Sequence, residues 1–109
     1  MKSLGLIEVE SVAAAIDCLD IMCKAADVSL VTWERKLGGR LVVIIVEGSI
    51  SAVTAAVEAA DTMAIKSLAA KAVIANPHSE TERMVLKSAS RLKKKEKAEK
   101  PNNDHIKEV

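Results

Sequence analysis

The sequence predicts an α+β fold of the ferredoxin-like kind, in which a four-stranded antiparallel sheet carries helices on one face. Three observations predict it. Apolar, β-branched runs alternate with alanine-rich stretches of helical period in the order βαββαβ. Two of the apolar runs are joined by a short connection that contains two glycines, which is typical of a hairpin. The length of 109 residues corresponds to one domain.

The chain begins with a strand and a helix. Residues 4–9 are apolar and form a short first strand, and Ser11 is the expected N-cap of a helix over residues 12–26. Apolar side chains of that helix recur at the i, i+3, i+4 and i+7 spacing, which predicts one buried face. That face consists of Val12, Ala15, Ile16, Leu19, Met22, Cys23 and Ala26.

A hairpin follows the first helix. Its strands are predicted over residues 28–33 and 41–46, and Gly38 and Gly39 lie between them. Glycine there allows positive φ or a close approach of backbones. Three cations crowd the same connection: Arg35, Lys36 and Arg40. A tip of this kind can bind an anion or pack against copies of itself, and the residues alone leave both open.

The second half repeats the alternation of helix and strand. Ser49 is expected to cap a helix over residues 50–63, and a fourth strand is predicted over residues 69–75. With two helices on one face, the other face of the sheet and its edges stay uncovered within one subunit. The core is built from small and aliphatic side chains, so partner subunits would add stability. Both considerations favour an oligomer.

A third helix and a basic tail follow the sheet. Ser79 and Glu82 form a capping box, which predicts a helix that starts there and runs at least to Leu92. We expect a domain over residues 1–86 and a C-terminal extension over residues 87–109 that is partly helical and then disordered. The domain has eight basic and eleven acidic residues, a balance of −3, whereas the extension has eight basic and four acidic residues, a balance of +4.

Several functional classes find little support in the sequence. The two histidines, His78 and His105, belong to no cluster with metal-ligand spacing, and no cofactor motif is present. Nothing marks a base and nucleophile pair, so we expect no enzyme activity. The glycine connection lies between two strands, whereas a phosphate loop lies between a strand and a helix. Nucleic-acid binding by this fold uses aromatic side chains, and Trp33 is the single aromatic residue.

Composition also bears on location. No apolar run approaches the length of a membrane span, and the N-terminus enters a strand directly, so we expect neither membrane insertion nor a signal peptide. Cys18 and Cys23 are five residues apart on the predicted helix and form no CxxC pair. They are expected to be buried or half-buried free thiols in a reducing cytoplasm.

Four short stretches of the sequence form a recognisable series in their order and spacing: Leu4–Glu8, Asp20–Ala26, Val46–Val53 and Val73–His78. Together they resemble the single-domain shell proteins of bacterial microcompartments. These are the hexamer-forming subunits of carboxysomes and of propanediol- and ethanolamine-utilisation compartments. The resemblance covers about residues 1–86.

The resemblance implies a structural protein without catalysis or cofactor. Its flat homohexamers would tile edge to edge into the shell of a cytoplasmic compartment, with neighbouring hexamers, other shell proteins and encapsulated enzymes as partners. The resemblance also implies a central pore for small polar or anionic metabolites. The pore-lining residues would be Lys36, Leu37, Gly38, Gly39 and Arg40.

The resemblance also implies residues at the rim of the hexamer. Lys24 would contact its counterpart on the next hexamer, and Asn76, Pro77 and His78 would lie near the same edge. Asn76 stands where the family commonly has an arginine, so a fork of hydrogen-bond donors is lost there.

Two questions stay open at this stage. Arg40 takes the place of a small residue of the family's loop, and it either faces the pore or turns away and pairs with Glu34 or Glu47. The alternative function is a ferredoxin-like oligomeric regulatory protein that senses a small anionic ligand between subunits. The mass in solution distinguishes the two functions, because a sensor of this kind would form a dimer or trimer.

Overall fold

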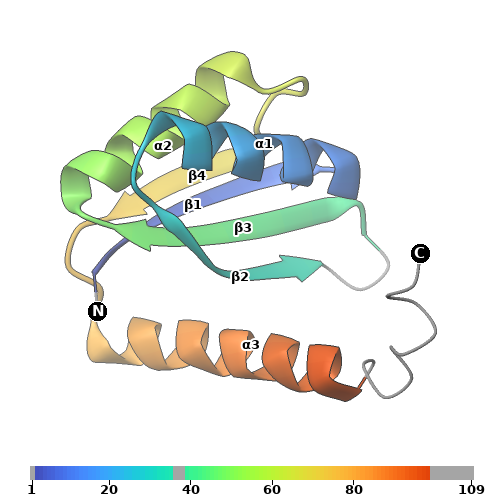
Figure 1. Cartoon of the computed structure of the whole chain (residues 1–109), viewed down its shortest axis with the longest axis vertical. Coiled ribbons are helices and arrows are strands. Elements are labelled where there is room, and N and C mark those ends of the chain that lie inside the picture. The colour runs from blue at the N-terminus through green and yellow to red at the C-terminus, as the bar shows by residue number, and fades with distance from the viewer. Residues whose placement is uncertain (1, 36–38, 99–109) are drawn as a thin grey trace, which may run out of the picture.

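The elements follow the predicted order. A computed structural model describes residues 2–35 and 39–98 of the chain (Figure 1). Its helices and strands are β1 (Ser3–Glu10), α1 (Val12–Ala25), β2 (Ser29–Arg35), β3 (Leu41–Gly48), α2 (Ile50–Met63), β4 (Ala70–Ile74) and α3 (Ser79–Ala98). The predicted α+β fold is confirmed.

The sheet is antiparallel, with the strand order β2-β3-β1-β4 that the ferredoxin-like arrangement requires. Helices α1 and α2 lie side by side on one of its faces (Figure 1). Glu10 pairs with Leu41 at one end of the sheet, which we call the loop end because the connection 36–40 leaves the sheet there. Ser3 pairs with Gly48 at the opposite end, which we call the far end.

Serine side chains cap the N-termini of both α1 and α2, as predicted. The Ser11 Oγ accepts a hydrogen bond from the N–H of Ala14 at 3.1 Å, and the Ser49 Oγ accepts one from the N–H of Ala52 at 3.1 Å. Ser11 has a φ of 87°, which is rare for a residue with a side chain. Its own N–H donates to the carbonyl of Arg40 at 2.9 Å. The corner between β1 and α1 is therefore fastened to the start of β3.

The main core lies between the sheet and helices α1 and α2. Gly5 lets α2 approach the sheet closely, because a Cβ atom at this position would lie 3.0 Å from the Cγ2 of Val57. Buried alanine side chains on α1 and α2 likewise let these helices pack close to the sheet. The buried members are Ile7, Val9, Ala14, Ala15, Cys18, Met22, Val42, Ile44, Val46, Val53, Ala56, Val57 and Ala60.

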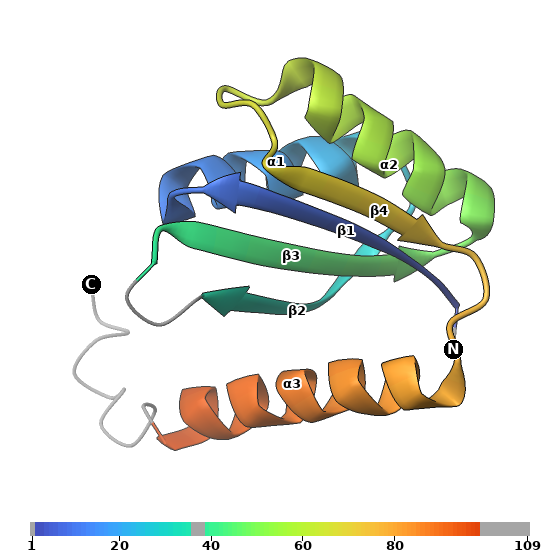
Figure 2. The same cartoon turned by 180° about the vertical axis from the view of Figure 1, so that it is seen from behind.

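Helix α3 lies on the opposite face of the sheet (Figure 2). Its Val85 is buried against Leu4 and Ile45, which point away from the main core. The expectation that this face stays uncovered is therefore wrong. It failed because strand residues supply apolar side chains to both faces, and the amphipathic α3 is long enough to pack on the second one. The helix continues to Ala98, past the predicted minimum at Leu92.

The start of α3 also differs from the prediction. Ser79 is the first residue of the helix and not its cap. His78 takes that role, because its Nδ1 accepts a hydrogen bond from the N–H of Glu80 at 3.0 Å and its carbonyl accepts one from the N–H of Glu82 at 3.0 Å. An imidazole nitrogen here replaces the hydroxyl oxygen that the capping-box pattern led us to expect.

A polar bridge holds α3 to the edge strand β2. The pairing of β2 with β3 slips by one residue between Leu30 and Thr32, and Thr32 is fully buried. The Thr32 Oγ1 lies 2.9 Å from the Oγ of Ser88. Ser88 donates its single hydroxyl hydrogen to the carboxylate of Glu34. Thr32 is therefore the donor to Ser88, and the three residues form one directed chain of hydrogen bonds.

Replacing Ser88 with alanine should lower the free energy of unfolding by about 1–3 kcal/mol, because the Thr32 hydroxyl would stay buried without its acceptor. Chemical denaturation at a fixed protein concentration measures this difference. Ser90→Ala, at an exposed site on the same helix, is the matched control and should change the stability by less than about 0.5 kcal/mol. Adding Thr32→Val should recover most of the loss. Equal stabilities of the Ser88→Ala and Ser90→Ala variants would contradict the role of the bridge.

Candidate functional site

The residues expected to line a pore belong to the connection at the loop end. Lys36, Leu37 and Gly38 fall outside the described residues. Gly39 and Arg40 are described, and both are exposed. The side chain of Arg40 is 84% exposed, so its guanidinium is available to solvent and to other chains.

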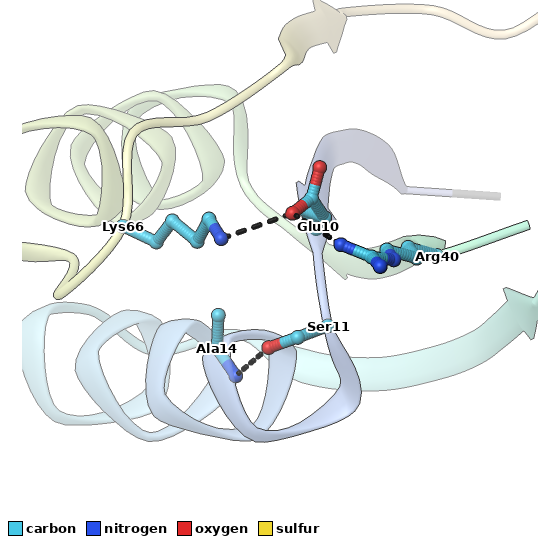
Figure 3. A network of polar contacts seen from close by, with 5 residues as sticks. All are labelled: Glu10, Ser11, Ala14, Arg40 and Lys66. Carbon is cyan, nitrogen blue, oxygen red and sulfur yellow. Dashed lines mark hydrogen bonds and ion pairs between the residues drawn. The ribbon is translucent and has the colours of Figure 1, made fainter.

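Arg40 belongs to a small charged cluster at the loop end (Figure 3). Its Nη1 lies 3.9 Å from the Oε1 of Glu10, the last residue of β1. The Nζ of Lys66, from the segment between α2 and β4, donates to the same Oε1 at 3.0 Å. One carboxylate therefore faces two cations. In both pairs the groups are partly solvated, so each pair contributes little to stability.

Neither carboxylate expected as an alternative partner takes that role. Glu34 accepts the hydrogen bond from Ser88 and lies 3.6 Å from the Nη2 of Arg91. Glu47 lies at the far end, about 20 Å along β3 from Arg40 by the rise of an extended strand. The alternative in which Arg40 pairs with Glu34 or Glu47 is therefore wrong. Glu34 receives its arginine from α3, and Glu47 lies at the wrong end of the sheet.

The cluster holds the pKa of Glu10 below its ordinary value. The main cause is the hydrogen bond from Lys66, followed by the positive charge of Lys66, and Arg40 adds a smaller effect, while burial opposes them. A lowered pKa keeps the carboxylate ionised at neutral pH, and the ion pairs weaken as the pH falls through the folded-state pKa. Sequence reasoning did not find this cluster. It missed Lys66 because no local pattern links residues 56 positions apart.

Lys24 lies near the end of α1, on the side of the molecule away from the loop end. Its Nζ is 2.8 Å from the Oδ2 of Asp20, one helical turn earlier, and its side chain is 77% exposed. The hydrogen bond and the charge of Asp20 raise the pKa of Lys24. The residue therefore presents a fully charged and accessible ammonium group.

Residues 76–78 leave the end of β4 and enter α3, also at the far end. Pro77 is buried, whereas Asn76 and His78 are exposed. The Oγ of Ser3 donates to the carbonyl of Ala75 at 2.6 Å, which fixes the exit of the strand. The end of α1 leads into β2, whereas residues 76–78 follow β4. Strands β3 and β1 lie between β2 and β4 in the sheet. The structure thus brings the expected rim residues to the same end of the sheet but not into one cluster.

The cysteines are both free thiols. Cys18 is buried in the main core, and burial, with a smaller effect of the nearby Asp17 charge, raises the pKa of its thiol. Cys23 is exposed, so the expectation of a buried or half-buried side chain is wrong for it. Its position on the predicted apolar face was misleading, because it lies at the margin of that face.

A shallow apolar groove runs between α1 and β2. Sequence reasoning placed Val12 and Ile16 on the buried face of α1, but both are exposed, Ile16 at 62%. Leu30 of β2 is exposed as well. The groove is lined by Val12, Ala15, Ile16, Leu19, Leu30, Trp33, Val42 and Ile44. The groove therefore leaves apolar side chains accessible to solvent beside the edge strand β2.

Within residues 2–35 and 39–98, no three histidine, cysteine or acidic side chains are grouped as a metal site requires. No helix there combines the length and the apolar character needed to cross a membrane.

Comparisons with known proteins agree with this fold. A family model described as the BMC domain matches residues 3–77. The bacterial microcompartment shell protein PduA of Citrobacter freundii is 38% identical over 91 residues, which cover 82% of this chain and 97% of PduA. The carboxysome shell protein CsoS1A of Hydrogenovibrio crunogenus is 41% identical over 83 residues, which cover 73% of this chain and 85% of CsoS1A.

A solved structure extends the comparison to three dimensions. A microcompartment protein from Desulfitobacterium hafniense DCB superposes with a TM-score of 0.68 and 32% identity over 81% of this chain. The superposition covers 48% of that protein, so this chain spans about half its length. Fold and relatives together define a structural α+β subunit of a protein shell. The chain belongs to the BMC domain family of bacterial microcompartment shell proteins.

Proposed function

We propose that this chain forms flat homohexamers that tile edge to edge in a microcompartment shell, with residues 36–40 around a central pore. The observation that carries the proposal is the separation of two groups of residues. Arg40 lies at the loop end of the sheet, and Lys24 lies toward the far end, as do residues 76–78. A subunit of this shape can present its loop end to a six-fold axis and its far end to the rim.

The flanks of the subunit support a side-by-side arrangement. The apolar groove between α1 and β2 opens on one side of the sheet. Strand β4 is the edge strand on the other side, and its residues 70–73 are exposed. A ring of identical subunits joins one flank of each copy to the other flank of the next. Apolar side chains such as Ile16 and Leu30 would then leave solvent.

The chemistry of the loop end favours small polar or anionic metabolites in the pore. Gly39 adds no side chain, and Arg40 adds a cation at each of six positions. A ring of cations around a narrow opening selects for anions. We propose neighbouring hexamers, other shell proteins and encapsulated enzymes as partners in the bacterial cytoplasm. The second sheet face, covered by α3, would be one of the two broad faces of the layer.

Electron microscopy and native mass spectrometry of the purified full chain test the proposal. We expect a mass of six subunits and extended layers with hexagonal order. A dimer or trimer whose melting temperature rises with phosphate or another small anion would instead support a regulatory sensor and overturn the shell proposal.

Arg40→Ala should reduce the preference of the pore for anions by several fold, because a ring of six cations is lost. Uptake of matched anionic and cationic dyes into assembled shells measures the preference. Arg83→Ala is the control, since Arg83 is an exposed arginine near the start of α3 that pairs with Glu80 in its own helix. Unchanged discrimination in the Arg40→Ala variant would show that Arg40 does not act at the pore.

A further inference from the structure

We infer that Glu10 sets how strongly Arg40 acts at the loop end, and that Glu10 thereby determines the degree of anion preference of the pore. The inference rests on the proposed function and assigns a specificity-determining residue that lies outside the connection 36–40. Its basis is the arrangement of Glu10, Ser11, Arg40 and Lys66 (Figure 3).

The backbone fixes the position of Arg40 relative to Glu10. Glu10 pairs with Leu41 across the β1–β3 ladder, and the N–H of Ser11 donates to the carbonyl of Arg40 at 2.9 Å. Ser11 keeps this bond with a φ of 87°, and its side chain is at the same time engaged as the cap of α1. The register therefore places Glu10 next to Arg40 at the end of the ladder, where the Nη1 of Arg40 lies 3.9 Å from the Oε1 of Glu10.

Two cations share this carboxylate unequally. Lys66 approaches its Oε1 to 3.0 Å with a hydrogen bond, whereas Arg40 remains at 3.9 Å and is largely exposed. Arg40 is thus attracted toward β1 but not neutralised. The cluster carries one net positive charge in each subunit, and it would carry two without the carboxylate. In a ring of six copies the difference is six charges at one opening.

Removing Glu10 and removing Lys66 have opposite consequences for Arg40. Removing Glu10 leaves both cations without their carboxylate. Removing Lys66 leaves Glu10 to Arg40 alone, which brings the local charge to zero and draws the guanidinium toward β1. A merely structural role of Glu10 would give no such reversal, because loss of either partner would then weaken the same contact.

The test uses hexamers of the full chain in planar lipid bilayers under a potassium chloride gradient. The reversal potential gives the ratio of chloride to potassium permeability. We expect Glu10→Gln to raise this ratio by about threefold or more and Lys66→Gln to lower it by a similar factor. Glu58→Gln is the charge-matched control. Glu58 is exposed on α2 near Lys71, Ala72 and Val73, and its loss should leave the ratio unchanged.

The outcomes separate this inference from the proposed function. Native mass spectrometry establishes first that the wild-type chain is a hexamer, and the bilayer recording establishes that this hexamer conducts. Failure to form a conducting hexamer would overturn the proposed function. If the wild type conducts, an unchanged ratio in Glu10→Gln and Lys66→Gln overturns the inference alone. An equal increase in Glu58→Gln overturns it too, since the effect would then reflect total charge. Loss of most of the gain on adding Arg40→Gln to Glu10→Gln supports action through Arg40.

Discussion

Leu4→Ala is expected to lower the free energy of unfolding by about 2–5 kcal/mol. Leu4 is fully buried on the side of β1 that faces α3, where it packs with Ile45 and Val85. Its truncation leaves a cavity that the sheet cannot close, because the backbone of β1 is paired with a strand on each side. A loss of this size is a large part of the roughly 5–15 kcal/mol that stabilises an ordinary domain.

Leu86→Ala is the matched control, since it makes the same chemical change on α3 at a side chain that is 53% exposed. Thermal and urea unfolding of both variants at one protein concentration give the comparison, because oligomer formation makes apparent stability depend on concentration. Leu4→Ala should also make α3 the first element to lose amide protection in hydrogen exchange. Similar stabilities of the two variants would contradict the packing of α3 on the sheet.

Lys24→Asp is expected to abolish extended layers while hexamers remain. The proposed contact places Lys24 next to its counterpart on the neighbouring hexamer. In the free subunit Lys24 neutralises Asp20 at 2.8 Å. The substitution puts two carboxylates one turn apart near the negative end of α1, so each rim position gains a net negative charge. Repulsion between two such rims acts at every edge of the hexamer, whereas the contacts around the pore are untouched.

Electron microscopy shows how often layers form. Size-exclusion chromatography with light scattering measures the molar mass of the assemblies and so shows whether hexamers remain. Lys87→Asp reverses a charge at an exposed site on α3 and serves as the control, which should still form layers. Layers formed by Lys24→Asp at wild-type frequency would show that Lys24 does not lie at the rim. Loss of hexamers in Lys24→Asp would show that it belongs to a contact within the ring.

Local signals in the sequence were sufficient for the order and type of every element. The caps Ser11 and Ser49 were predicted because a serine directly before a helical stretch commonly caps the helix. The hairpin was predicted from two β-branched runs on either side of Gly38 and Gly39. The helix of residues 50–63 was predicted with the bounds it has in the structure, since Ser49 marks its start and its apolar stripe ends at Met63.

Features that depend on distant contacts were not predictable in this way. The docking of α3 depends on Val85 meeting Leu4, some eighty residues earlier, and the predicted domain boundary after Leu86 falls inside this helix. That boundary stays a prediction. A truncation before Ser88 would remove the bridge to Thr32, whereas a truncation after Ala98 would leave all described contacts in place.

The candidate site also combines residues that the sequence could indicate with residues that it could not. Its residues came from the resemblance to shell proteins, and their assignment to pore and rim stays a proposal. The resemblance contained no information about Glu10 and Lys66, because their pairing joins a strand end to a segment between α2 and β4. The direction of Arg40 was the open question of the sequence, and the structure gives it a partner that neither alternative named.

The direction of α3 on the sheet separates the charges of its side chains. Ser88 contacts Thr32 and Arg91 contacts Glu34, so the helix runs along β2 toward the loop end and carries Lys93 and Lys94 there. Its first turn, with Glu80 and Glu82, remains at the far end. The side chains of α3 are therefore acidic at the far end and basic toward the loop end.

In the proposed ring, six copies of α3 direct their basic ends toward one axis. Their mutual repulsion opposes closure of the ring and weakens when salt screens it. Multivalent anions gathered at the axis would oppose this repulsion more strongly than an equal ionic strength of monovalent salt. Assembly of the shell would then depend on the same class of molecule that the opening admits.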